Sequence, residues 1–351
     1  MSRRPVRPMI QALLAALLFG ASTPAAKLLL GEIEPVPLSA LLYLGSGLGL
    51  LTTQAMRRLN GGPTTEAPLD RRDLPWLIGA VMAGGVAAPI VLLFSLRVTP
   101  AATASLLLTF EGGATTLLAA LVFREAIGRR AWLAITAITS AGVVLTLNEG
   151  GEWGLAPGAV GVLVACTLWG LDNNLTRQIS AKNPLTIVTV KGLAAGALSL
   201  ALAWTLDMSW PAPTATLAAL ALGSVSYGAS VVLFVRAMRG LGASRTGAIY
   251  GTAPFVGAVI SFLVFPESPG VLLLLAFVLM AAGMALLAGE EHAHHHVHAA
   301  VAHDHHHEHS PHHAHPHAAD ESGPHAHPHY HNPLAHEHPH APDIHHRHEH
   351  S

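Results

Sequence analysis

Three ionisable residues lie deep inside long apolar runs of the sequence, away from the ends of the runs, where a charge is expensive enough to need an explanation. Glu111 stands near the middle of the run 100–123, about 16 Å from its ends by helical rise. A carboxylate at that depth is tolerated mainly when it faces a polar cavity or carries a proton. Glu111 is therefore interpreted either as a proton- or cation-binding site, or as a protonated acid hydrogen-bonded to a neighbouring helix for packing.

A second polar group lies in the sequence CTLWGLDNNLTR, which contains Asp172, Asn173 and Asn174. By helical rise, Asp172 lies about 9 Å from the end of its predicted helix, and Lys191 about 10 Å from the start of the next one. Equal depth on successive helices predicts an ion pair between Asp172 and Lys191. The pair is either an inner gate or contact for a substrate carboxylate, or a structural pair that leaves neither charge stranded. The two asparagines either line a polar path or hydrogen-bond neighbouring helices together.

Weaker candidates are Trp169, which could shape a cavity, and Tyr250, which offers a hydroxyl group. An aromatic residue in a membrane helix more often faces lipid or the protein core. Glycines four residues apart, at Gly192/Gly196 and at Gly247/Gly251, predict tight helix packing. The sequence contains no phosphate-binding glycine loop and no credible nucleophile–base set, so it does not indicate an enzyme.

The elements that must position these residues are ten apolar runs. Hydrophobic residues make up 51% of the chain and charged residues 11%, about half the charged share of a soluble protein. Each run is long enough to cross ~30 Å of hydrocarbon as a helix. Helices are favoured over a barrel because each segment must pair its own backbone groups in lipid. The runs are 9–30, 37–56, 74–96, 100–123, 131–147, 156–178, 184–206, 214–236, 246–265 and 269–288.

The runs form two related halves. At an offset of 142 residues, VFREAIG at 122–128 aligns with VFPESPG at 264–270, and at an offset of 150, LFGASTPAAK at 18–27 aligns with LWGLDNNLTR at 168–177. Because the second of these copies lies in mid-chain, the first run is interpreted as a span rather than a secretory signal. The predicted organisation is an N-terminal segment 1–8, a five-helix repeat 9–148, a linker 149–155, a second five-helix repeat 156–288 and a tail 289–351.

Basic residues are distributed unevenly between the loops. With the N-terminus inside, the inner loops hold nearly all of the arginines, whereas the outer side receives Arg97 and Lys27. The positive-inside rule therefore predicts a multi-pass protein of the cell's inner, or plasma, membrane with both termini in the cytoplasm. Five helices per half is an odd number, so the halves insert upside down relative to each other. Inverted repeats are typical of secondary transporters, whose substrate site lies near the midplane.

The motifs resemble those of a known family. LFG and LWG in helices 1 and 6, with VFREAIG…SAG and VFPESPG…AAG in helices 4–5 and 9–10, are similar to the drug/metabolite transporter superfamily, and within it to the EamA-type transporters. The resemblance covers residues 9–288 and implies a permease that moves small polar metabolites, amino acids or drugs, mostly outward and without ATP. One departure concerns coupling: helix 9 keeps the family's mid-helix proline as Pro254, but helix 4 has FEGG there, with Glu111 in place of a neutral residue.

The tail carries all 25 histidines, beginning at His292. It has almost no large apolar residue and is expected to be disordered. Imidazoles at this density predict binding of Zn²⁺, Ni²⁺, Co²⁺ or Cu²⁺. The metal-binding candidates are His294, His295, His296, His305, His306, His307, His312, His313, His345 and His346.

The sequence therefore predicts an all-α integral membrane protein of ten helices that exports a small polar or zwitterionic solute, coupled to protons through Glu111. No required cofactor and no nucleic-acid partner are predicted, and a homodimer is compatible with the sequence. Two alternatives stay open: a divalent-metal exporter supplied by the tail, and a membrane-anchored metal buffer or sensor that transports nothing. The first would find few ligands along its path, because the body before His292 has no histidine and one cysteine, Cys166.

Overall fold

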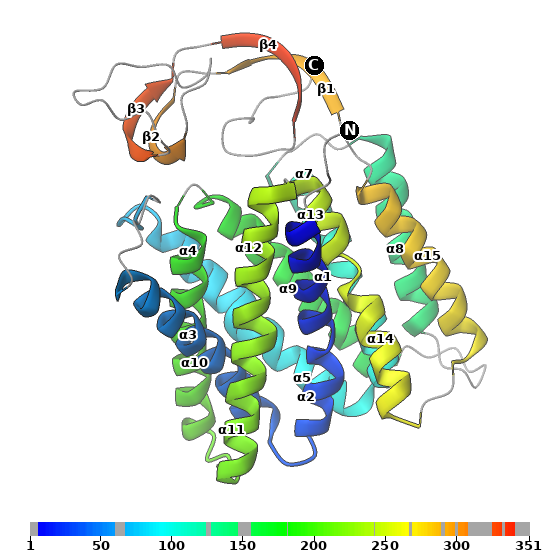
Figure 1. The fold of residues 1–351 in the computed structure, drawn as a ribbon. Helices are drawn as coiled ribbons and strands as arrows, with labels where there is room; N and C mark the ends of the chain where they lie inside the picture. Colours follow the sequence, from blue (N-terminus) through cyan, green and yellow to red (C-terminus); the bar gives the residue numbers. More distant parts are fainter. Residues whose placement is uncertain are drawn as a thin grey trace.

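The membrane body is a bundle of helices packed side by side (Figure 1). The computed structural model describes residues 6–59, 67–123, 128–146, 156–180, 182–241, 243–266 and 269–288, and four tail segments, 292–298, 301–307, 325–331 and 334–340. We call the end of the bundle where α1 (Val6–Gly20) begins the N-terminal face, and the opposite end, where α2 (Ser22–Leu29) ends, the far face. The N-terminal face is uppermost in Figure 1.

Each of the ten predicted runs contains helix, and several runs are divided into two or three elements. The remaining elements of the body are α3 (Pro35–Leu59), α4 (Leu74–Ala80), η1 (Val81–Ala87), α5 (Ala88–Val98), α6 (Ala101–Leu107), α7 (Phe110–Leu121), α8 (Arg129–Thr146), α9 (Pro157–Arg177), α10 (Pro184–Thr205), α11 (Pro213–Leu222), η2 (Gly223–Ala229), α12 (Ser230–Leu241), α13 (Ala243–Tyr250), α14 (Ala253–Val264) and α15 (Val271–Ala288).

Not every run meets the requirements of a membrane span equally well. Within the described residues, seven spans are long and apolar enough to cross a bilayer, and a shorter apolar helix covers Val271–Leu286. The seven are Val6–Leu29, Pro35–Met56, Leu74–Val98, Ala101–Leu121, Pro184–Thr205, Pro213–Leu241 and Arg245–Val264. Ten membrane crossings therefore stay a prediction.

Prolines begin several of these helices. Pro157, Pro184 and Pro213 each occupy the first turn of α9, α10 or α11, where the missing N–H would have had no partner within the helix. At α10, the side chain of Asn183 also accepts a hydrogen bond of 3.1 Å from the backbone N–H of Thr186. These signals fix where the helices that carry Asp172 and Lys191 start.

Two π-helical segments interrupt otherwise α-helical spans. η1 joins α4 to α5, and η2 joins α11 to α12. Their bounds differ by 142 residues at both ends, which is the offset that relates the two halves of the sequence. The same local departure from α-helix therefore occurs at equivalent positions of both halves.

Two other spans are broken at equivalent positions. α6 ends at Leu107 and α7 begins at Phe110, while α13 ends at Tyr250 and α14 begins at Ala253. The two breaks lie 143 residues apart, within one residue of the sequence offset of 142. Of these four half-helices, α7 and α13 lie toward the N-terminal face and α14, with α6 packed against it, toward the far face (Figure 1). Discontinuous helices at equivalent positions of two repeats are a hallmark of transporter binding sites.

Glycines permit the closest helix contacts. A Cβ placed on Gly192 would lie 2.8 Å from the backbone nitrogen of Gly47, and one on Gly196 would lie 2.7 Å from that of Leu44. The tight packing predicted for this pair is confirmed, and it joins α10 to α3. For the pair Gly247/Gly251 the prediction is confirmed at Gly251, whose Cβ position would meet the side chain of Met284, and wrong at Gly247, where no atom of a neighbouring helix lies within 4 Å of a Cβ position.

The remaining helices complete the bundle. α8 and α15 pack against each other along one side of the molecule (Figure 1). The largest core cluster includes the fully buried side chains of Leu38, Leu93 and Leu106, which come from three different spans. Leucine and alanine dominate this core, so the polar residues described below stand out against an apolar surrounding.

The tail differs from its predicted disorder in four short segments. β1 (His292–His298) pairs with β4 (Leu334–His340), and β2 (Val301–His307) pairs with β3 (His325–His331), both antiparallel. Extended, period-two sequence allows such pairs to form through backbone hydrogen bonds. An isolated two-stranded pair is only marginally stable in water, so the strands impose nothing on the membrane body. The strands lie beyond the N-terminal face in Figure 1.

Candidate functional site

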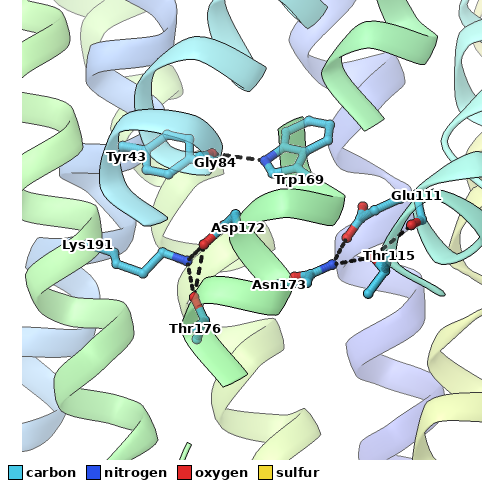
Figure 2. Close-up of polar contacts among 9 residues, drawn as sticks. All are labelled: Tyr43, Gly84, Glu111, Thr115, Trp169, Asp172, Asn173, Thr176 and Lys191. Carbon is cyan, nitrogen blue, oxygen red and sulfur yellow. Dashed lines mark hydrogen bonds and ion pairs between the residues drawn. The ribbon is translucent and has the colours of Figure 1, made fainter. Parts of the chain in front are cut away.

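Two polar centres lie on either side of α9. Asp172 and Asn173 are consecutive residues, and a helix turns by about 100° per residue, so their side chains diverge. Figure 2 shows Asp172 directed toward Lys191 of α10 and Asn173 directed toward Glu111 of α7. One helix thus positions both centres: it carries Asp172 to Lys191, the pair that the sequence predicted, and Asn173 to Glu111, a contact that it did not predict.

The first centre is a buried ion pair. Lys191 Nζ lies 2.5 Å from Asp172 Oδ1, and their side chains are 15% and 8% exposed. Thr176, one turn along α9, donates its hydroxyl to the same carboxylate oxygen at 2.9 Å and accepts from Lys191 Nζ at 3.2 Å. The predicted Asp172–Lys191 contact is confirmed, and each charge has a partner of opposite sign.

The second centre has no such neutralising partner. The Asn173 side-chain amide donates to Glu111 Oε1 at 2.9 Å and to Thr115 Oγ1 at 3.1 Å. Glu111 is half-buried and Asn173 is exposed, although both lie in helices of the bundle. Among the described residues, no basic nitrogen lies within 4 Å of the Glu111 carboxylate. The Glu111 carboxylate is therefore accessible, and when it is ionised no basic group of the described residues lies close enough to neutralise it.

Asn174 links two helices of the bundle through its side chain. Its side-chain amide donates to the carbonyl oxygens of Thr115 and Gly170, both at 2.9 Å. Because Thr115 belongs to α7, this buried side chain fastens α7 to α9 one turn from Glu111. Of the two interpretations given for the asparagines, helix attachment fits Asn174, whereas Asn173 reaches the accessible carboxylate.

The π-helix η1 exposes a backbone carbonyl near the ion pair. In a π-helix a carbonyl accepts from the N–H five residues later, as the Ala83 carbonyl does from Ala88. For Gly84 that residue is Pro89, which has no N–H. The Gly84 carbonyl instead accepts from the Tyr43 hydroxyl at 2.7 Å and from Trp169 Nε1 at 2.9 Å (Figure 2).

Trp169 is thus placed at the site, but as a fixed hydrogen-bond donor. Tyr250 lies apart from both charged centres in a cluster of aromatic rings. Its ring centroid is 5.3 Å from that of Phe19 and 4.8 Å from that of Phe234, and its hydroxyl lies 3.4 Å from Ser230 Oγ. Tyr227 of η2 joins the same cluster through Phe19, with 5.8 Å between the two ring centroids. Nothing in these contacts brings Tyr250 to Glu111.

Tyr43, Gly84, Thr115 and Thr176 were not predicted from the sequence. Threonines and glycines are common in membrane helices, so their types carry little information. One usable signal existed for Gly84: the proline five residues later marks a carbonyl that loses its helical donor. Recognising it requires knowing that the helix is a π-helix at that point.

Gly84 also makes room for the ion pair, which gives a testable prediction. A Cβ on Gly84 would lie 2.0 Å from Asp172 Oδ2, while no atom of a neighbouring helix lies within 4 Å of one on Gly112. Gly84→Ala is expected to destabilise the protein by roughly 1–3 kcal/mol through overpacking. The matched change Gly112→Ala is expected to be neutral or stabilising by up to about 1 kcal/mol. Thermal unfolding in detergent measures both, and equal midpoints for the two variants would contradict this arrangement.

A separate ionic contact joins the two halves at the N-terminal face. Lys182 Nζ lies 3.2 Å from Asp70 Oδ2 and 3.6 Å from Asp73 Oδ2. Beside it, the backbone N–H of Asn183 donates to the Ala67 carbonyl at 3.0 Å. The backbone N–H of Arg72, and then Lys182, hold the pKa of the Asp70 carboxyl below its ordinary value. The contact is thus fully formed at neutral pH.

The predicted metal ligands of the tail cannot be placed. His312, His313, His345 and His346 lie outside the described residues, and for the candidates in β1 and β2 only the backbone is described. In the described part of the chain, no group of three or more His, Cys, Asp or Glu side chains could hold a metal ion. Metal binding by the tail stays a prediction.

Comparison with known proteins identifies the family of this chain. The model of the EamA-like transporter family matches residues 6–147 and again 156–289, which together make up most of the chain. The chain belongs to the EamA-like transporter family. The resemblance seen in the sequence motifs is therefore confirmed, and membership of the EamA-like transporter family implies a multi-pass membrane protein that moves a small solute across the bilayer.

Individual relatives of this EamA-like chain agree with the family. It is 28% identical over 292 residues to an uncharacterized transporter of Methanothermobacter thermautotrophicus strain Delta H, covering 79% of this chain and 85% of that protein. One solved crystal structure superimposes with a TM-score of 0.58 at 22% identity, over 81% of this chain and 96% of that one. At this identity the structural likeness concerns the fold.

Proposed function

We propose that the chain is a secondary transporter that exports a small polar or zwitterionic solute and couples its movement to protons through Glu111. The observation that carries this proposal is the Glu111 centre: a carboxylate beside a helix break, accessible, and bound by a neutral amide. An ionised carboxylate in a membrane is costly, and protonation removes that cost. Glu111 can therefore change charge as its surroundings change.

The contrast with Asp172 supports this assignment. Asp172 is buried and lies 2.5 Å from Lys191, so protonating it would leave a buried ammonium group without its counter-charge. Protonating Glu111 disrupts no ion pair within the described residues. We assign proton exchange to Glu111, and a structural or gating role to the Asp172–Lys191 pair.

The orientation in the membrane follows from charge. Arg71, Arg72, Arg129, Arg130 and Arg177 lie in or next to the connections at the N-terminal face. By the positive-inside rule, this distribution supports a cytoplasmic orientation of the N-terminal face and of both termini in the inner membrane. Solute leaving the cell would enter the body from the N-terminal face.

Everted membrane vesicles test the proposal, because export then appears as accumulation in the lumen. Uptake of labelled amino acids, other small polar metabolites, amine drugs and divalent metals is measured with and without an acidic lumen. We expect a non-metal solute to accumulate only with the pH gradient and to be released by a protonophore. Accumulation of divalent metals alone, or uptake that ignores the gradient, would contradict the proposal.

The histidine-rich tail gives a second prediction, which separates the proposal from the metal-linked alternatives. The helices pack without it, so deletion of 290–351 is expected to leave solute transport largely intact. The same deletion removes all 25 histidines and should abolish high-capacity binding of Zn²⁺ or Ni²⁺. Equilibrium dialysis with the metal and vesicle transport measure the two effects. Loss of transport with the tail would favour the metal exporter.

A further inference from the structure

The two halves of the molecule differ at one contact that their symmetry predicts. At the offset of 142, Ser105 corresponds to Gly247 and Thr115 to Gly257, and at the offset of 150, Gly20 corresponds to Gly170. These residues form two equivalent trios, Gly20–Gly257–Ser105 and Gly170–Thr115–Gly247. In the first trio, Gly20 and Ser105 belong to the first half and Gly257 to the second. In the second trio the halves are exchanged, with Gly170 and Gly247 in the second half and Thr115 in the first.

The first contact of each trio is present on both sides. A Cβ on Gly20 would lie 3.2 Å from the backbone nitrogen of Gly257, and one on Gly170 would lie 2.9 Å from the backbone nitrogen of Thr115. The equivalent helices therefore approach each other closely at both positions. This agreement supports the offsets as a guide to structural counterparts.

The second contact is present on one side and absent from the other. A Cβ on Gly257 would lie 3.0 Å from Ser105 Oγ, so α14 packs against α6 toward the far face. The counterpart of that contact would join Thr115 to Gly247. No neighbouring atom lies within 4 Å of a Cβ position on Gly247, and within the described residues α7 and α13 make no extensive contact with each other.

Other contacts also hold the helices together at the far face, so this face is closed in the present structure. α2 packs against both α6 and α14. Lys27, in the last turn of α2, donates to the Thr99 carbonyl and lies 6.0 Å from the centre of the Phe265 ring. Toward the N-terminal face, by contrast, Glu111 is half-buried and Asn173 exposed. The Lys182–Asp70 contact closes only the α4 and α10 side of that face.

We infer that α7 and α13 form the gate of the N-terminal face, and that the gate closes by bringing Thr115 against Gly247 as Ser105 and Gly257 part. The inference rests on the proposed transport function. Because Thr115 binds Asn173 beside Glu111, closure would cover the Glu111 centre from the cytoplasmic side. On this inference, residue 247 has to be small because Thr115 packs against it when the gate is closed, a state that differs from the present structure.

Substitution at Gly247 tests this directly. Gly247→Leu fits the empty space seen here and should fold normally, but the larger side chain would prevent closure. We expect its transport to fall roughly tenfold or more, as overpacking of a close contact predicts. Gly247→Ser is the matched control, because serine occupies the equivalent position 105 in the closed contact. It should transport at close to the normal rate.

Spin-label distances provide a readout that needs no knowledge of the solute. One label pair, Leu121→Cys with Arg245→Cys, reports on the N-terminal face, and its counterpart at the same offset, Thr103→Cys with Leu263→Cys, reports on the far face, both with Cys166→Ser. We expect two populations in the otherwise unchanged protein, with one pair short when the other is long. Gly247→Leu should retain only the population with a short far-face distance.

The outcomes separate this inference from the proposed function. If the distances exchange as expected while no solute responds to a pH gradient, the gate stands and proton coupling fails. The gate is overturned if Gly247→Leu shows the short N-terminal-face distance, if both distances change in the same direction, or if the unchanged protein shows one population from pH 5 to pH 8. Equal transport by Gly247→Leu and Gly247→Ser would overturn it as well.

Discussion

Glu111→Gln is expected to abolish proton-driven solute accumulation while leaving the fold intact. The amide has nearly the shape of the carboxylic acid and can still bond to Asn173, which lies 2.9 Å away. It cannot take up or release a proton, so a pH gradient can no longer do work through it. One pH unit is worth about 1.4 kcal/mol per proton, or a tenfold solute gradient for one-to-one exchange. That accumulation should vanish.

The measurement is accumulation in everted vesicles at imposed pH gradients, with energy-independent exchange as a second assay. Glu111→Asp keeps a carboxyl group and should retain part of the coupled transport. Glu32→Gln, an exposed acid at the far face, is the matched control and should have no effect. Coupled accumulation by Glu111→Gln at the normal level would remove Glu111 from the coupling mechanism.

The second large effect is expected from separating Asp172 and Lys191. Asp172→Asn leaves the Lys191 ammonium buried without its counter-charge, which is expected to cost about 3–5 kcal/mol of stability. Changing both residues, as in Asp172→Asn with Lys191→Gln, removes both charges and should recover part of that loss. Thermal unfolding of the two single variants and the double variant measures the coupling between the residues.

Asp70→Asn provides the comparison for this series. It removes an exposed partner of Lys182 at the N-terminal face, and exposed pairs contribute about 0–1 kcal/mol. If the Asp172 and Lys191 changes prove merely additive, the two groups do not stabilise each other despite their 2.5 Å separation. Recovery of stability without recovery of transport would assign the pair a part in gating.

Much of this site could be predicted from the sequence, because membranes impose simple rules. Charges are rare in lipid, so Glu111, Asp172 and Lys191 were conspicuous from their types alone. Depth along a helix follows from residue count, and successive helices are neighbours, which was enough to predict the Asp172–Lys191 pair. The membrane body and its family were predictable from apolar runs and motifs for the same reason.

The rest depended on geometry that hydropathy does not record. A π-helix changes the hydrogen-bond partner by one residue without changing which residues are apolar, so η1 and η2 left no visible pattern. The contact between Asn173 and Glu111 depends on the rotation of α9 relative to α7, which depth cannot supply. Gly247 was predicted to pack tightly, and the structure shows it open, because spacing cannot say in which conformation a contact forms.

The paired π-helices carry information about ancestry. A π-turn arises when one residue is added to an α-helix, and such an addition would shift one copy relative to the other if it occurred after duplication. η1 and η2 instead correspond residue for residue at an offset of 142, the same offset that aligns VFREAIG at 122–128 with VFPESPG at 264–270. This correspondence favours an extra residue that was already present in a single five-helix ancestor, kept by both descendants while their sequences in that segment, VMAGGVA and GSVSYGA, diverged almost completely.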